Sequence, residues 1–227
     1  MSVLNNLTRL LEEIEQEAKR AGRDPGEISV VAVSKGCSVK AIEEAYWAGV
    51  RDFGENRVQE ALSKMETTPS EIRWHFIGKL QKNKVNKVIG RFDLIHSVDT
   101  VELVEKIDQA GRERGVISSI LLEANTSGEM TKSGLSPKEW EANFEDLLDL
   151  KAIEIHGLMT MAPLTEDESV IRHSFSALRL LRDRLQQIAR DRADLSTLSM
   201  GMSHDFPIAI QEGATLLRIG TAIFSPR

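Results

Sequence analysis

The sequence predicts an α/β protein, a single closed (β/α)8 barrel with an extra helix at its N-terminus. Eight short, largely apolar runs alternate with helical runs, which is the pattern of a parallel sheet with helical crossovers. The length of 227 residues is close to the roughly 250 typical of such barrels. No linker or low-complexity tract divides the chain, so residues 1–227 are expected to form one domain. A doubly wound open sheet is the alternative.

The first segment is expected to be an amphipathic helix, because its apolar residues recur at helical spacing. These residues are Leu4, Leu7, Leu11, Ile14 and Ala18. Gly22 and the Pro25-Gly26 pair end the helix.

The expected strands follow as short apolar runs, several of them apolar throughout, as strands buried on both faces should be. They are residues 28–33, 51–53, 74–77, 94–97, 119–124, 153–159, 197–200 and 216–219. The helices between them are expected at residues 39–48, 57–64, 82–89, 100–114, 137–148, 166–190 and 205–212.

Composition excludes several classes of protein. The charge sum of 29 basic and 35 acidic residues is −6, which argues against a general nucleic-acid binder. Cys37 is the single cysteine, so an internal disulfide and a multi-cysteine zinc site are excluded, and the five histidines show no metal-ligand spacing. No apolar run approaches the ~20 residues that cross a bilayer, and Arg9 and Glu12 interrupt any signal peptide. We expect a cytoplasmic protein with no metal, nucleic-acid or membrane partner.

Lys35 is the most informative single residue, because barrel chemistry gathers at the carboxyl ends of strands. It follows the apolar run 30–33, so its stem would lie in the barrel wall and its amine at the mouth. Desolvation there would disfavour the ammonium form and leave an amine able to attack an aldehyde. The alternative is a lysine that only extends into solvent.

The loops after the last two expected strands suggest a phosphate site. Gly201, Ser203, Gly220 and Thr221 offer hydroxyls and accessible N–H groups where barrels often bind phosphate. Ordinary turn chemistry is the alternative. Together with a lysine at the same mouth, these loops suggest a phosphorylated carbonyl compound.

Arg218 is expected inside a strand, where a buried charge needs a partner. The partner is an Asp or Glu in the ordinary case, or a ring atom of a ligand if the arginine is functional.

The basic residues of segment 79–91 are best explained as a solvated cationic face, with an anion-binding or partner surface as the second interpretation. These residues are Lys79, Lys82, Lys84, Lys87 and Arg91.

Seven stretches match a known family in the same order. They are residues 31–35, 53–60, 74–81, 129–134, 156–161, 198–203 and 218–225. The sequence resembles the pyridoxal 5′-phosphate (PLP) homeostasis proteins over nearly its whole length. One departure is Gly36-Cys37 after the lysine, where many members carry a threonine or another short residue. The resemblance implies a barrel like the N-terminal domain of alanine racemase.

The resemblance also implies that PLP is the cofactor, held as an internal aldimine on Lys35. Arg218 would face the pyridine nitrogen and Asn56 would lie beside the ring. Ser203, Gly220 and Thr221 would hold the phosphate. The remaining implied pocket residues are Ser199 and Met200 near the phosphate, and His75 and Met159 in the pocket wall.

The implied function is PLP binding in intracellular PLP homeostasis, without substantial catalytic turnover. An arginine is always protonated and would keep the ring nitrogen unprotonated, which weakens the cofactor as an electron sink. Alanine racemase also takes a second acid–base group from a C-terminal β-domain and a partner subunit. This chain ends at Arg227 after the last barrel strand, and its single tyrosine, Tyr46, lies in the first barrel helix, so efficient racemisation is expected to be absent.

Two alternatives stay open. One is a slow PLP-dependent amino-acid racemase with Lys35 as its sole base, and the other is a Schiff-base aldolase in which Lys35 attacks a sugar phosphate without a cofactor. PLP-dependent apoenzymes are candidate partners of the carrier. A monomer is expected, because the dimer interface of alanine racemase involves the β-domain.

Overall fold

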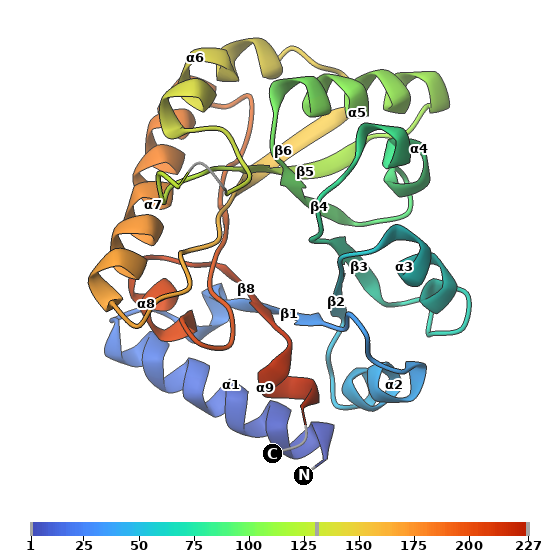
Figure 1. Cartoon of the computed structure of the whole chain (residues 1–227), viewed down its shortest axis with the longest axis vertical. Helices are drawn as coiled ribbons and strands as arrows, with labels where there is room; N and C mark the ends of the chain where they lie inside the picture. Colours follow the sequence, from blue (N-terminus) through green and yellow to red (C-terminus); the bar gives the residue numbers. More distant parts are fainter. Residues whose placement is uncertain (1, 130–131, 226–227) are drawn as a thin grey trace.

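The computed structural model describes residues 2–129 and 132–225, and in them eight parallel strands form a closed barrel (Figure 1). The ends of the chain and part of the 129–134 stretch lie outside the described residues. The strands are β1 (Ser29–Val33), β2 (Asp52–Glu55), β3 (Arg73–Phe76), β4 (Leu94–Val98), β5 (Ser118–Glu123), β6 (Ile153–Met159), β7 (Thr197–Ser199) and β8 (Leu216–Ile219). Each strand pairs with the next and β8 pairs with β1, which confirms the barrel and excludes the open sheet.

Helices surround the barrel on its outside (Figure 1). They are α1 (Val3–Arg20), α2 (Val39–Trp47), α3 (Val58–Met65), α4 (Val85–Val88), α5 (Val101–Arg114), α6 (Pro137–Leu147), α7 (Glu168–Ala189), α8 (Phe206–Gln211) and α9 (Thr221–Phe224), with 3-10 turns η1 (Pro25–Glu27) and η2 (Lys82–Lys84). The expected helix 82–89 is instead η2 followed by the single turn α4, and α9 was not predicted. Within the described ranges, no helix has the length and apolar character needed to span a bilayer.

The N-terminal helix α1 covers the wall where the barrel closes. The helix α9, which follows β8, has only four residues, and α1 covers most of the outer face near β8 and β1. The helix α1 packs against α8, α9 and α2 (Figure 1). Asn6 Nδ2 donates to the carbonyl of Ile223 (3.0 Å), and Arg23, just after α1, donates to the carbonyls of Ile210 and Ala214 (2.8 Å each).

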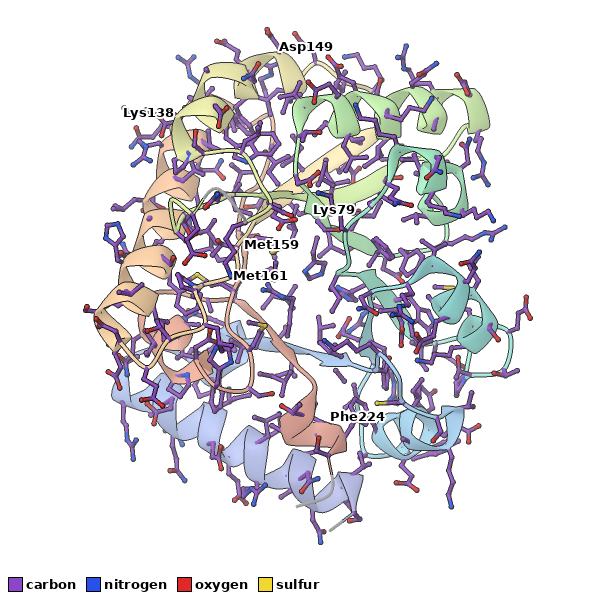
Figure 2. All side chains as sticks on the ribbon, viewed as in Figure 1. Lys79, Lys138, Asp149, Met159, Met161 and Phe224 are labelled. Atoms are coloured by element: carbon purple, nitrogen blue, oxygen red, sulfur yellow. The ribbon has the colours of Figure 1, made fainter. Side chains whose placement is uncertain are left out.

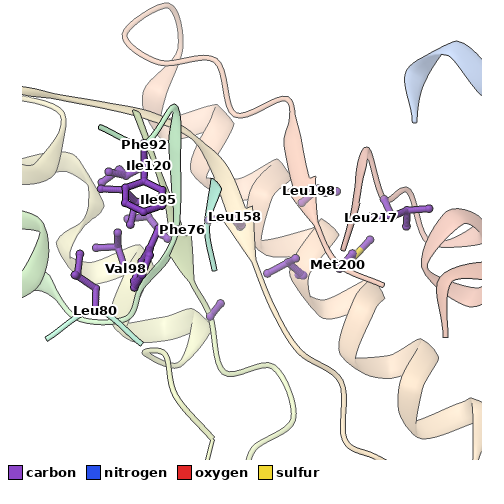
Figure 3. Close-up of a cluster of buried hydrophobic side chains, with 14 of the residues drawn as sticks. Phe76, Leu80, Phe92, Ile95, Val98, Ile120, Leu158, Leu198, Met200 and Leu217 are labelled. Carbon is purple, nitrogen blue, oxygen red and sulfur yellow. The ribbon is translucent and has the colours of Figure 1, made fainter. Parts of the chain in front are cut away.

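Alternation along the strands creates two different environments. Outward side chains such as Phe76, Ile95 and Leu158 form the apolar core between barrel and helices (Figure 3). The buried side chains of Val31 and Leu121 do not belong to that core, because they face the barrel interior. That interior also holds buried histidines, a serine, a glutamate and an arginine, so its polar content is unusual for the apolar layers that normally fill such barrels.

Candidate functional site

Lys35 lies in the turn that connects the carboxyl end of β1 to α2. The backbone N–H of Cys37 closes this turn by donating to the carbonyl of Ser34 (2.9 Å). The side chain of Lys35 is exposed. The expectation that the barrel wall removes its amine from water is therefore not borne out, although its position at the mouth of the barrel agrees with the sequence.

A buried cluster behind the sheet holds both sides of the Lys35 turn. Nζ of Lys64 on α3 lies 2.7 Å from Oε1 of Glu55 and 2.7 Å from Oε1 of Glu60. The same Nζ donates to the carbonyl of Ser34 (2.8 Å), and the N–H of Gly36 donates to Glu60 Oε1 (2.7 Å). Sequence reasoning did not single out this cluster. The i,i+4 spacing of Glu60 and Lys64 is the signal that indicates part of it.

The charges in this cluster depend on one another. Burial raises the pKa of Glu55, although hydrogen bonds from Lys64 and Ser34 oppose the change. Burial disfavours the Lys64 ammonium, but its hydrogen bonds to Glu55 and Glu60 outweigh that effect and raise the pKa of Lys64. Lys64 therefore stays charged and is what makes a fully buried Glu55 tolerable.

Asn56 follows β2 directly and is half-buried. The end of β3 passes close to it, because a Cβ on Gly78 would lie 2.2 Å from the carbonyl oxygen of Asn56. Only glycine permits this approach, so the ends of β2 and β3 meet at the mouth of the barrel.

Arg218 on β8 lies inside the barrel and is only 5% exposed. Its Nη1 donates to Oγ of Ser199 (2.6 Å) and its Nη2 donates to the carbonyl of Thr160 (2.9 Å). Among the described residues, no carboxylate forms an ion pair with this guanidinium. Burial lowers the pKa of Arg218 to about 10, with the charges of Asp205 and Glu123 opposing the shift, so the group is still protonated at neutral pH.

His75, which the resemblance places in the pocket wall, is buried in the barrel interior. Its Nε2 lies 3.0 Å from Oδ1 of Asp52, and its Nδ1 lies 2.9 Å from Nε2 of His96 on β4. Nδ1 of His96 in turn lies 2.8 Å from Oγ of Ser199. Sequence reasoning missed His96 and Asp52, and no local signal connects them, because these partners come from different strands.

Glu123 at the end of β5 is a second interior group that sequence reasoning missed. It is 4% exposed and lies in register with Met159, which is itself in register with Ser199. Burial and the nearby charge of Asp99 raise the pKa of Glu123 to about 7, against the opposing charges of Arg218 and Lys79.

The two predicted phosphate loops lie together. Oγ of Ser203, after β7, accepts a hydrogen bond from the N–H of Ala222, next to Thr221 (3.4 Å). Gly220 and Ser203 are half-buried and Thr221 is exposed. Gly201 has φ +95°, and a Cβ there would lie 2.6 Å from Cβ of Ala209, so this glycine serves packing against α8.

The remaining predicted pocket residues occupy different environments. Met159 is buried at the end of β6, and Figure 2 shows it toward the middle of the ring of strands. Ser199 is buried in the interior through its contacts with His96 and Arg218. Met200 belongs instead to the apolar core, near Leu198 in Figure 3. The cofactor roles of these three residues stay predictions.

The comparisons with known proteins agree with this arrangement. A family model described as the alanine racemase N-terminal domain matches residues 6–227. The pyridoxal phosphate homeostasis protein of Aquifex aeolicus is 41% identical over 228 residues, which cover 100% of this chain and 99% of that protein. The chain belongs to the pyridoxal phosphate homeostasis protein family.

Other members and solved structures extend the likeness. The pyridoxal phosphate homeostasis protein of Escherichia coli is 36% identical over 230 residues, covering 99% of this chain and 97% of that one. The structure of PipY from Synechococcus elongatus with PLP bound has a TM-score of 0.81 at 39% identity, covering 93% of this chain and 100% of PipY. An alanine racemase from Clostridium difficile, at 15% identity and a TM-score of 0.74 over 96% of this chain and 56% of its own, shows the shared fold alone.

Proposed function

We propose that this pyridoxal phosphate homeostasis family member binds PLP reversibly at the carboxyl end of the barrel and serves PLP homeostasis in the cytoplasm, without substantial catalytic turnover. One observation carries the proposal: a buried, charged Arg218 without a carboxylate partner among the described residues lies in the barrel whose mouth bears Lys35. The PLP-bound structure of PipY supports the choice of ligand.

The donor set fits PLP. Bound PLP would supply an electrophilic aldehyde and an electron-withdrawing ring. Lys35 offers a primary amine for the aldehyde, and its exposure leaves that amine accessible. The hydroxyls of Ser203 and Thr221, with the N–H groups of the Gly220 loop, are donors suited to a phosphate.

Arg218 argues for a carrier rather than a racemase. A guanidinium only donates hydrogen bonds, so its natural partner is an unprotonated ring nitrogen. That pairing weakens the ring as an electron sink for carbanion chemistry. Asn56 beside the ring, with Ser199 and Met159, completes the proposed site, whereas the side chain of Met200 packs in the apolar core and His75 lines the cavity near the amino ends of the strands. PLP-dependent apoenzymes as recipients and a monomeric state also belong to the proposal.

Replacing Lys35 with alanine is expected to abolish covalent PLP attachment. Wild-type protein incubated with PLP and desalted should retain a visible absorption band, which borohydride should convert into a stable adduct that peptide mass mapping locates at Lys35. The K35A variant should show neither the band nor the adduct, because no other amine replaces Lys35 at this turn.

Lys79→Ala is the matched control, because Lys79 is an exposed lysine at the end of β3, at the same mouth. It should keep the band and the adduct. Retention of PLP by K35A equal to that of wild type would refute the role of Lys35, and a wild type that retains no PLP would refute PLP binding.

A slow PLP-dependent racemase is a second candidate, and Glu123 favours it. Its carboxyl group, with a pKa of about 7, is an acid–base group inside the barrel that sequence reasoning did not find. Chiral analysis of alanine and serine after long incubation with PLP distinguishes the two. Racemisation that is lost in Glu123→Gln would favour the enzyme, and its absence in wild type would favour the carrier.

A further inference from the structure

A continuous chain of hydrogen-bonding side chains crosses the barrel interior from Arg218 to Asp52. Its successive contacts are Arg218 Nη1 to Ser199 Oγ (2.6 Å), Ser199 Oγ to His96 Nδ1 (2.8 Å), His96 Nε2 to His75 Nδ1 (2.9 Å) and His75 Nε2 to Asp52 Oδ1 (3.0 Å). The contributing strands are β8, β7, β4, β3 and β2, so the fold alone assembles the chain.

The two ends of the chain lie in different parts of the barrel. Asp52 and Arg73 are the first residues of β2 and β3, and both line a cavity of about 540 Å³ at the amino ends of the strands. Arg73 Nε and Nη2 donate to Asp52 Oδ1 and Oδ2 (2.7 and 2.6 Å). Arg218 lies toward the carboxyl ends, on the side of the proposed PLP site. The chain therefore links one end of the barrel to the other.

Chemistry fixes the direction of the bonds at the two ends of the chain. Arg218 can only donate. Asp52 can only accept, because hydrogen bonds from His75 and Arg73 outweigh the effect of burial and keep the pKa of Asp52 below its usual range, so it is ionised. Complete burial is the main cause that keeps the pKa of His96 well below its usual value, so His96 is neutral.

With a single ring proton on each of the two histidines, the middle of the chain follows from these ends. Ser199 Oγ accepts from Arg218, so its own proton is free to be donated to Nδ1 of His96. His96 then carries its single ring proton on Nε2 and donates it to Nδ1 of His75. His75 donates from Nε2 to Asp52. In the opposite tautomer of His96, Ser199 would receive two donors and its own proton would need another acceptor.

We propose that His96, His75 and Asp52 are positioning residues that act through Ser199 to hold the Arg218 guanidinium in one orientation as a donor beneath the PLP ring nitrogen. This inference rests on the proposed function. Ser199 is held as an acceptor toward Arg218 because Nδ1 of His96 accepts its proton. His96 is held in this tautomer because Nδ1 of His75 accepts the proton on its Nε2, and Asp52 in turn accepts the proton on Nε2 of His75. Nη1 and Nη2 of Arg218 are committed to Ser199 and Thr160. Its Nε, which has no hydrogen-bond partner among the described residues, is left to face a ligand.

The first test reads the tautomer of His96 in PLP-free wild-type protein by two-bond ¹H–¹⁵N NMR correlation. The expected result is a proton on Nε2 and none on Nδ1 of His96, at neutral pH. A proton on Nδ1 of His96 would overturn the proposed direction of the chain. This result does not depend on PLP binding, so its failure is distinguishable from failure of the proposed function.

The second test measures PLP affinity by fluorescence titration of two His96 variants. His96→Leu removes both hydrogen bonds and is expected to weaken PLP binding about tenfold to a hundredfold, because Arg218 loses the partner that orients Ser199. His96→Gln keeps an oxygen to accept from Ser199 and an N–H to donate to His75, so it should restore most of the affinity. A role in packing alone predicts the opposite order, since leucine suits an apolar site better than glutamine.

Leu121→Ala is the matched control, because Leu121 is fully buried in the barrel interior but outside the chain. Its PLP affinity should stay within about threefold of wild type. Equal affinities for wild type and His96→Leu, or equal losses in the leucine and glutamine variants, would overturn the proposal. A wild type that binds no PLP would instead refute the proposed function.

Discussion

Replacing Lys64 with methionine is expected to lower the free energy of unfolding by about 3–5 kcal/mol. Methionine matches the length of lysine but leaves Glu55, which is fully buried, without its countercharge. Oγ of Ser34 still donates to Oε1 of Glu55 (2.6 Å), but this hydroxyl carries no charge, and Oε2 has no hydrogen-bond partner among the described residues. Urea denaturation followed by tryptophan fluorescence measures the loss.

A double variant distinguishes the charge from the volume. Removing the buried charge as well, in Lys64→Met with Glu55→Gln, should recover more than half of the lost stability, because a neutral amide costs less to bury than an unpaired carboxylate. Lys40→Met, on an exposed lysine of α2, is the control and should change stability by less than about 0.5 kcal/mol. A double variant as unstable as the single one would contradict the unpaired-charge explanation.

The same cluster connects stability with the proposed site. Lys64 and Glu60 hold the carbonyl of Ser34 and the N–H of Gly36, the neighbours of Lys35. Loss of Lys64 should therefore loosen the Lys35 turn and slow PLP attachment even under conditions where the variant is folded. Hydrogen exchange at Gly36 reports this local effect separately from global unfolding.

Replacing Glu123 with glutamine is expected to make the protein more stable at pH 8 by up to about 3 kcal/mol and to change little at pH 5. An unfolded glutamate titrates near pH 4.5, whereas the pKa of Glu123 in the fold is about 7. Between these values the folded chain binds more protons than the unfolded one. The wild type therefore loses stability as the pH rises through this window, by about 1.4 kcal/mol for each unit.

Glutamine removes this titration while keeping the size of the side chain. Urea denaturation at pH 5, 6, 7 and 8 should give diverging curves, with the variant above the wild type at high pH. Glu44→Gln, on an exposed glutamate of α2, should run parallel to wild type. Parallel curves for Glu123→Gln and wild type would show that Glu123 does not titrate in this window.

Local sequence patterns were sufficient to predict the order of the strands and helices. Expected strands 153–159 and 216–219 have the observed bounds of β6 and β8, because short, largely apolar runs bounded by turn residues identify strands. Segment 82–89 differs because its valines satisfy a helical spacing, but the chain there forms a 3-10 turn before the single turn of α4. The four-residue α9 is too short to show any periodicity.

The sequence likewise predicted some features of the candidate site and not others. Lys35, Asn56, Ser203, Gly220 and Thr221 could be named from the sequence because each follows the end of a strand, and a closed barrel brings such ends to one mouth. Their alignment with family stretches then suggested PLP. The exposure of Lys35 could not be predicted this way, since the depth of a side chain depends on the neighbouring strands.

The sequence by itself determined the order of strands and helices, the barrel and the family, because these follow from periodicity, turn residues and motifs that lie within short segments. Only the tertiary structure decided which polar groups meet inside the barrel. His96 and Ser199 are 103 residues apart, yet they share a hydrogen bond, and Glu55 and Lys64 pair behind the sheet across a turn. Such contacts depend on barrel closure and strand register, which place inward side chains from several strands in one desolvated space, where each must find a partner or change its pKa.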